Sequence, residues 1–234
     1  ERGQQYEILV IIVERAALVE QLNKIKTTGL IVCAVDVSPI ALLNTARLHF
    51  SGELPENLLY VDIGAKKMEI NIVKNGVIRF TRQITLGGEA LTISLSETLD
   101  LSLDEAEQLK RKKGIPSDAL PRIALLKLID RMIVEIQRSV DYYRAQSRES
   151  GIDKILLMGG LPLLPGFLPY FSDFFEAPVE IENALQCDDF KDTSEIEKLF
   201  EGIFKNKNTT FEKASKKAAR KAKRKNNNSF FKSI

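Results

Sequence analysis

Three short apolar segments follow one another between residues 58 and 84, and only tight turns separate them. The second turn is Asn75-Gly76, a pair that favours the two-residue turns of β-hairpins. In residues 68–72 apolar and polar side chains alternate strictly, which predicts a strand with one buried face and one face in water. The predicted strands of this antiparallel meander are residues 58–63, 67–74 and 77–84.

Helical patterns follow the meander. Gly87-Gly88 opens a helix that runs to about residue 99, and a Ser102–Glu105 capping box starts another. Apolar residues at spacings of three and four then predict a long helix over residues 119–147. The remaining predicted elements after it are a strand at 152–158, a helix at 167–175 and a short strand at 179–181.

The residues before the meander predict a βαβα half-sheet. Its predicted elements are a strand at 7–13, a helix at 16–29, a strand at 31–35 and a helix at 38–50, which Ser38 caps ahead of Pro39. Strands alternating with helices place the whole chain in the α/β class.

The composition excludes several classes of protein. The 234 residues are 44% hydrophobic, which is enough to bury a core. With two cysteines and one histidine, the chain cannot build a disulfide scaffold or a four-ligand zinc site of Cys and His. We therefore expect a reducing, cytoplasmic compartment. Cys33 is expected in the core, and His49 is expected to pack or cap near a helix end.

Charge is distributed unevenly along the chain. Residues 205–234 carry a net charge of +10, whereas residues 1–204 carry −8. Directly before the basic residues, at 196–204, the sequence predicts a short amphipathic segment. The basic tail is either a solvated, self-repelling segment or a contact for anionic lipid or nucleic acid. Because no aromatic residues alternate with the basic ones, the nucleic-acid alternative is the weaker.

Three glycine sites share one property, because each lies where a predicted strand ends. They are Gly64 after Asp62, the pair Gly87-Gly88, and the pair Gly159-Gly160. A backbone without side chains can approach phosphate closely, and a helix N-terminus favours anions. With phosphate on the first hairpin, Asp62 could hold Mg²⁺ through water molecules.

The order of these sites resembles the actin-like ATPase superfamily, which has a ribonuclease H-like α/β fold. The resemblance is strongest to the FtsA-like family of type IV pilus assembly protein PilM, over about residues 6–186. Thr81-Arg82, Leu86 to Thr92 and Glu135 to Ser139 carry it best. It implies an ATP and Mg²⁺ site with a phosphate hairpin, a Gly-Gly turn, a helix touching ribose and adenine, and an adenosine loop. The corresponding residues are Asp62, Gly64, Ala65, Gly87, Gly88, Glu107, Lys110, Gly159, Gly160 and Leu161.

The sequence departs from the family pattern in three places. No counterpart of the family's N-terminal phosphate hairpin precedes residue 6, so we expect part of the first subdomain to be missing. Lys66 and Lys67 replace small hydroxyl residues, and they form either an exposed hairpin tip or a phosphate contact. Leu161 replaces a small residue and is expected to crowd a base.

The resemblance implies a cytoplasmic scaffold at the inner membrane of a bacterium. Because the first phosphate hairpin is absent, we expect this scaffold to bind adenine nucleotide weakly or not at all. Its implied partners are the cytoplasmic N-terminal peptide of a PilN-like protein and the pilus assembly ATPase. An active ATPase and an FtsA-like filament protein tethered to the membrane remain alternatives. The expected domains are an insertion subdomain at 1–52, a second lobe at 53–186, and an irregular segment with the basic tail at 187–234.

Overall fold

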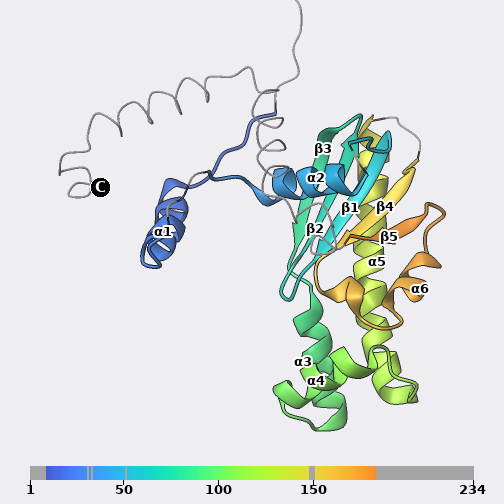
Figure 1. Ribbon diagram of the computed structural model, residues 1–234. Coiled ribbons are helices and arrows are strands. Elements are labelled where there is room, and N and C mark those ends of the chain that lie inside the picture. Colours follow the sequence, from blue (N-terminus) through green and yellow to red (C-terminus); the bar gives the residue numbers. More distant parts are fainter. Residues whose placement is uncertain (1–8, 31, 33, 51, 148–150, 183–234) are drawn as a thin grey trace, which may run out of the picture. The chain divides into compact units, whose positions relative to one another are not determined.

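The computed structural model describes residues 9–30, 32, 34–50, 52–147 and 151–182 (Figure 1). The predictions for Cys33, for the segment 196–204 and for the tail 205–234 lie outside these ranges.

The core of the fold is one five-stranded sheet with the strand order β3-β2-β1-β4-β5. Its strands are β1 (Asn57–Ile63), β2 (Met68–Lys74), β3 (Val77–Ile84), β4 (Lys154–Met158) and β5 (Val179–Ile181). The strands β1, β2 and β3 pair antiparallel, whereas β4 runs parallel to both β1 and β5. At the predicted hairpin turn, Asn75 and Gly76 both have positive φ angles, of 49° and 73°. The predicted meander is therefore confirmed.

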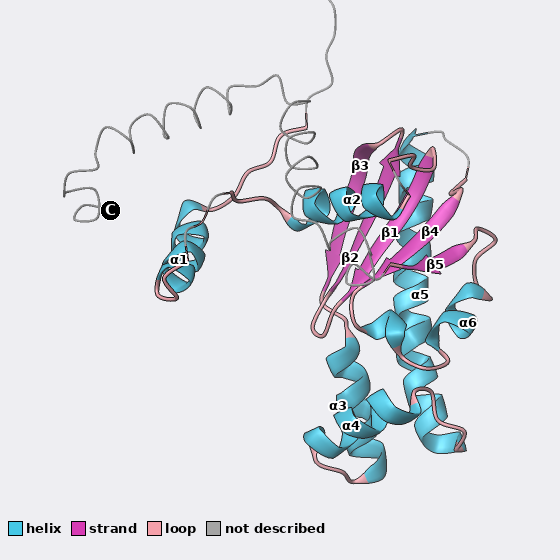
Figure 2. Ribbon diagram, viewed as in Figure 1, coloured by secondary structure: helices cyan, strands magenta, loops and turns pink. Residues whose placement is uncertain are grey.

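Helices cover both faces of the sheet (Figure 2). The long helix α5 (Ala119–Ser147) packs on the face that carries Leu59, Val61 and Ile63 of β1, and α2 (Ser38–His49) packs on the face that carries Leu58 and Tyr60. The other helices beyond the meander are α3 (Gly88–Leu99), α4 (Leu103–Lys113), the 3₁₀ turn η1 (Leu161–Leu163) and α6 (Phe167–Ser172). The last ends three residues earlier than predicted.

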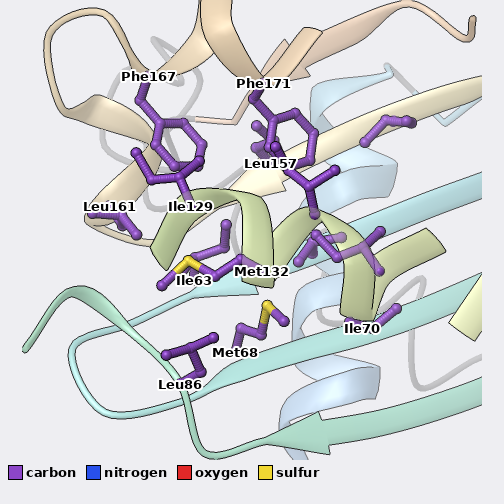
Figure 3. Packing of buried hydrophobic residues seen from close by; sticks show 14 of the residues in the cluster. Ile63, Met68, Ile70, Leu86, Ile129, Met132, Leu157, Leu161, Phe167 and Phe171 are labelled. Atoms are coloured by element: carbon purple, nitrogen blue, oxygen red, sulfur yellow. The ribbon is translucent and has the colours of Figure 1, made fainter. Parts of the chain in front are cut away.

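The larger apolar cluster lies between α5 and the sheet (Figure 3). Ile129 and Met132 of α5 pack with Ile63 and Met68 of the first hairpin, and all four are fully buried. Phe167, from α6, belongs to the same cluster. This packing fixes the ends of β1 and β4, where two of the predicted glycine sites begin.

The prediction that one face of β2 is in water is wrong. Glu69 and Asn71 are both buried, as are their apolar neighbours along the strand. In the strand register Glu69 lies opposite Asp62 and Asn71 lies opposite Tyr60, on the face that α2 covers. A period of two shows that the two faces differ in polarity, but a helix from elsewhere in the sequence decides whether the polar face meets solvent.

The predicted βαβα half-sheet at the N-terminus is also wrong for the described residues. Residues 9–13, 32, 34 and 35 belong to no helix or strand. The helix α1 (Arg15–Lys26) is present, although none of its side chains is buried. Apolar β-branched residues favour an extended backbone, but a strand also needs a neighbouring strand to pair with.

Candidate functional site

Asp62 and Gly159 meet at the ends of two adjacent parallel strands. Asp62 is the penultimate residue of β1, and its register partner in β4 is Met158, directly before Gly159. Gly159 has a φ of 88°, and a Cβ built there would lie 2.5 Å from Asp62 Oδ1 and 2.6 Å from the Ile63 carbonyl oxygen. Only glycine lets the backbone pass this close to the carboxylate.

The first hairpin docks against the start of α3. Gly88 N donates to the Gly64 carbonyl at 2.9 Å, and Glu89 N donates to the Ala65 carbonyl at 2.8 Å. A Cβ at Gly87 would lie 2.5 Å from both of these carbonyl oxygens. Two of the amides that open α3 are therefore bound to protein, so this helix start does not offer them to an anion.

The hairpin tip keeps backbone donors free. Gly64 N closes the turn by donating to the Lys67 carbonyl at 3.0 Å. The amides of Ala65 and Lys66, both on exposed residues, make no hydrogen bond to any other described residue. Lys67 Nζ donates to Gln83 Oε1 at 3.1 Å, whereas the Lys66 ammonium makes no ion pair within the described chain. Two adjacent free amides beside an exposed ammonium fit a phosphate group.

Glu107 and Lys110 lie in a buried network between α3 and α4. The Lys110 ammonium donates to the Gly88 carbonyl at 2.9 Å and to Thr92 Oγ1 at 2.7 Å, and it pairs with Glu107 Oε2. Burial raises the pKa of Glu107, but hydrogen bonds from Lys110, Thr92 and Arg111 outweigh it and hold the pKa at about 2. An ammonium has three N–H donors, and all three are used here.

Residues 158–166, which resemble an adenosine loop, pack on the end of α4. Gly114 ends that helix with a φ of 68°, and a Cβ there would clash with the Pro165 carbonyl oxygen, which also accepts from Ile115 N at 3.0 Å. Sequence reasoning missed Gly114, although a glycine after four basic residues at a helix end is a recognisable helix stop. It also missed Thr92, for which the sequence gives no signal.

Several of the predicted site residues lie close to one another around Gly88. A Cβ on Gly88 would lie 3.6 Å from Leu161 Cδ1, 3.6 Å from Lys110 Nζ and 3.8 Å from the Gly64 carbonyl oxygen. Leu161 is buried, and Gly160 is exposed with nothing within 4 Å of a built Cβ. A cavity of about 380 Å³ lies elsewhere, where Leu59 and Ile155 line it together with side chains of α5.

Asp62 is the one described residue at this junction that suits a hydrated cation. Its carboxyl is half-buried, and its pKa is raised by burial and by the Glu69 carboxylate, which Lys67 partly offsets. Within the described ranges no three His, Cys, Asp or Glu side chains are grouped to hold a metal directly. A lone carboxylate fits Mg²⁺ that keeps most of its water ligands and is shared with a phosphate.

The sheet order and its helical cover are those of an actin-like fold, as the comparison with solved structures shows. The similarity to a structure of a PilM–PilN type IV pilus biogenesis complex has a TM-score of 0.64 and 24% identity, over 73% of this chain and 48% of that one. For MreB5 of Spiroplasma citri bound to AMPPNP the TM-score is 0.61 and the identity 18%, over 83% and 68%.

The sequence places the chain within this class. The family model for type IV pilus assembly protein PilM matches residues 1–205, and the chain belongs to that family. It is also 28% identical to the cell division protein FtsA of Neisseria meningitidis, over 51% of this chain and 34% of FtsA. The identity to the ethanolamine utilization protein EutJ of Escherichia coli is 28%, over 67% of this chain and 50% of EutJ. The chain therefore spans a third to a half of the length of these relatives.

Proposed function

We propose that this chain is a scaffold of type IV pilus assembly that docks the cytoplasmic N-terminal peptide of a PilN-like inner-membrane protein. Membership in the PilM family carries the proposal, and a related structure is that of a PilM–PilN complex. In this role the chain lies at the cytoplasmic side of the inner membrane and couples to the pilus assembly ATPase. No helix of the described ranges is both long enough and apolar enough to cross a bilayer.

Residues 9–35 supply the docking surface in this proposal. Large apolar side chains of this segment are exposed, and between residues 9 and 13 their exposed fractions run from 45% to 90%. Exposed apolar surface of this extent is typical of a site that another chain covers. The members of this exposed group are Leu9, Val10, Ile11, Ile12, Val13, Val19, Ile25, Leu30 and Val35.

Adenine nucleotide binds this scaffold weakly or not at all. The free amides of Ala65 and Lys66 and the Asp62 carboxyl fit a phosphate with Mg²⁺. However, the Lys110 ammonium is fully bound within the protein, and Leu161 fills the space beside Gly88. A nucleotide that used Lys110 would have to break a buried network, and this cost reduces its affinity.

The docking proposal is tested by fluorescence anisotropy with a labelled synthetic peptide that carries the N-terminal cytoplasmic sequence of the PilN-like protein from the same genome. We expect saturable binding that Ile12→Glu weakens at least tenfold, because a charge would enter an apolar contact. Lys112→Met, on the exposed end of α4, is the matched control and should bind like the wild type. No binding by the correctly folded wild type would contradict the proposal.

The nucleotide proposal is tested separately by calorimetric titration with ATP and Mg²⁺ and by a phosphate-release assay. We expect a dissociation constant in the high micromolar range or weaker, and no turnover above background. ATP hydrolysis that Asp62→Ala abolishes would instead identify an active actin-like ATPase.

We also propose that the basic tail contacts anionic lipid, because residues 205–234 carry a net charge of +10. Sedimentation with vesicles containing phosphatidylglycerol tests this, and deletion of residues 205–234 should abolish binding. Unchanged sedimentation after the deletion would leave the tail without a membrane role.

A further inference from the structure

The only histidine of the chain bridges two elements of the fold. His49 is the last residue of α2. Its Nδ1 lies 2.7 Å from Glu182 Oε2, and its Nε2 lies 3.2 Å from Glu180 Oε2. Glu180 belongs to β5, and Glu182 follows that strand directly. Both nitrogens of one imidazole therefore face carboxylates at the sheet edge.

A neutral imidazole cannot satisfy this arrangement. It carries one N–H donor and one acceptor nitrogen, so one of the two carboxylates would face a lone pair. The imidazolium has a donor on each side and a positive charge between the two negative ones. The arrangement therefore favours the protonated form of His49 while both carboxylates are ionised.

The two glutamates depend on His49 to different degrees. Glu180 also pairs with Lys154 Nζ at 2.7 Å. The hydrogen bond from Lys154 is the main cause that lowers the pKa of Glu180, and the hydrogen bond with His49 lowers it further. Glu182 is buried, and its Oε2 makes no aligned hydrogen bond to any described residue. Burial raises the pKa of Glu182, and the charge of His49 lowers it in part. Among the described residues, the charge of His49 is thus what stabilises the buried Glu182 carboxylate.

His49, Glu180, Glu182 and Lys154 form one cluster, and no other ionisable side chain of the described residues pairs with it. Phe50 packs edge-on to the His49 ring, and Lys154 lies over the Phe50 ring. Arg47 of α2 points to a different place, because its Nη2 donates to the Gly76 carbonyl in the β2–β3 turn at 2.9 Å. The helix is consequently held by one contact that depends on the protonation of an imidazole and by a second contact that a guanidinium makes.

We propose that His49 is a pH-sensitive fastener, which holds the C-terminal end of α2 to β5 while the imidazole is protonated and releases it when the proton leaves. The contact is complete only where His49 and Glu182 are both charged. It is lost once the imidazole gives up its proton as the pH rises. It also weakens in acid, once Glu182 takes up a proton.

Hydrogen–deuterium exchange of the full chain at pH 6 and pH 8 tests the proposal. Exchange rates of amides in α2 are divided by their intrinsic rates and compared with amides in α5. In the wild type we expect the relative protection of α2 to fall roughly threefold or more between the two pH values, as for the loss of a partly buried ion pair. In His49→Gln the protection should be low at both pH values.

Arg47→Gln is the matched control, because it removes a contact of α2 that does not titrate in this range. It should lower protection at both pH values and leave their ratio as in the wild type. Nitrogen-15 spectra of the sole histidine at pH 6 should show both ring nitrogens protonated. Should His49→Gln fail to fold, Glu182→Gln should also remove the pH effect. Equal protection of wild-type α2 at both pH values, or the same pH effect in His49→Gln, would overturn the proposal.

Discussion

A methyl group at position 159 would meet the Asp62 carboxylate and the Ile63 backbone. The built Cβ lies 2.5 Å from Asp62 Oδ1 and 2.6 Å from the Ile63 carbonyl oxygen, closer than real Cβ atoms approach such groups. Gly159 also has a φ of 88°, where a side chain strains the backbone. Gly159→Ala should therefore destabilise the fold for two separate reasons.

The magnitude follows from these two reasons. A residue other than glycine in this backbone region costs about 1–2 kcal/mol. Overpacking against backbone that cannot move away costs about 1–3 kcal/mol. Together they predict a loss of about 3 kcal/mol in the free energy of unfolding. For a folded region of this size, the melting temperature should fall by roughly 6–12 °C.

Gly160→Ala is the matched control, one residue along the same loop. Gly160 has a φ of −82°, and a Cβ there meets nothing within 4 Å. Its substitution should change the free energy of unfolding by no more than about 0.5 kcal/mol. Urea unfolding followed by far-ultraviolet circular dichroism measures both variants. If the two variants differ by less than about 1 kcal/mol, the close approach of Gly159 to Asp62 does not exist in solution.

Three other changes test the networks around the site. Lys110→Met should cost about 1–3 kcal/mol in urea unfolding, because the Gly88 carbonyl, the Thr92 hydroxyl and Glu107 each lose one partner. Lys112→Met should cost less than about 0.5 kcal/mol. The lowered pKa of Glu107 stabilises the fold above pH 4.5, and this contribution should disappear as the pH falls towards 2. Urea midpoints between pH 6 and 3 should accordingly fall less steeply in Glu107→Gln than in the wild type. Ser38→Ala should cost about 1–2 kcal/mol by calorimetry, because Ser38 Oγ donates to the buried Glu69 at 2.7 Å.

Local signals predicted those parts of the fold that local chemistry decides. The Asn75-Gly76 turn needs positive φ angles, which these two residue types tolerate. The Ser102–Glu105 capping box forms as predicted, with each partner bound to the backbone of the other. Both features involve residues within a few positions of each other, so the sequence alone contains the whole interaction.

Signals that depend on a distant partner were misleading. Ser38 and Pro39 predicted a helix start, and α2 does begin there, but Val37 holds the cap position and the Ser38 hydroxyl binds Glu69 instead. The same contact explains why the polar side of β2 is buried. A hydroxyl before a helix is a capping signal only when no buried acceptor from another element lies closer.

Two of the stretches that resemble the family, Thr81-Arg82 and Glu135 to Ser139, contact each other in the structure. Arg82 Nη2 pairs with Glu135 Oε2 at 2.8 Å, and its Nη1 donates to Ser139 Oγ at 3.1 Å. This contact ties β3 to the middle of α5. These stretches, which carry the family resemblance, therefore hold the sheet and its covering helix together.

The same reasoning changes how the glycine motifs should be understood. The Gly87-Gly88 turn was predicted to offer amides to phosphate, but Gly88 N and Glu89 N bind the first hairpin instead. These two bonds hold the hairpin tip in place, and the amides of Ala65 and Lys66 at the tip stay free to bind an anion. Glycine is thus required at position 87 because the Gly64 and Ala65 carbonyl oxygens approach it closely. Phosphate binding would depend on the hairpin, whose position this contact supports. A variant such as Gly87→Ala should then weaken anion binding only through loss of the hairpin's position, together with a loss of stability of about 1–3 kcal/mol.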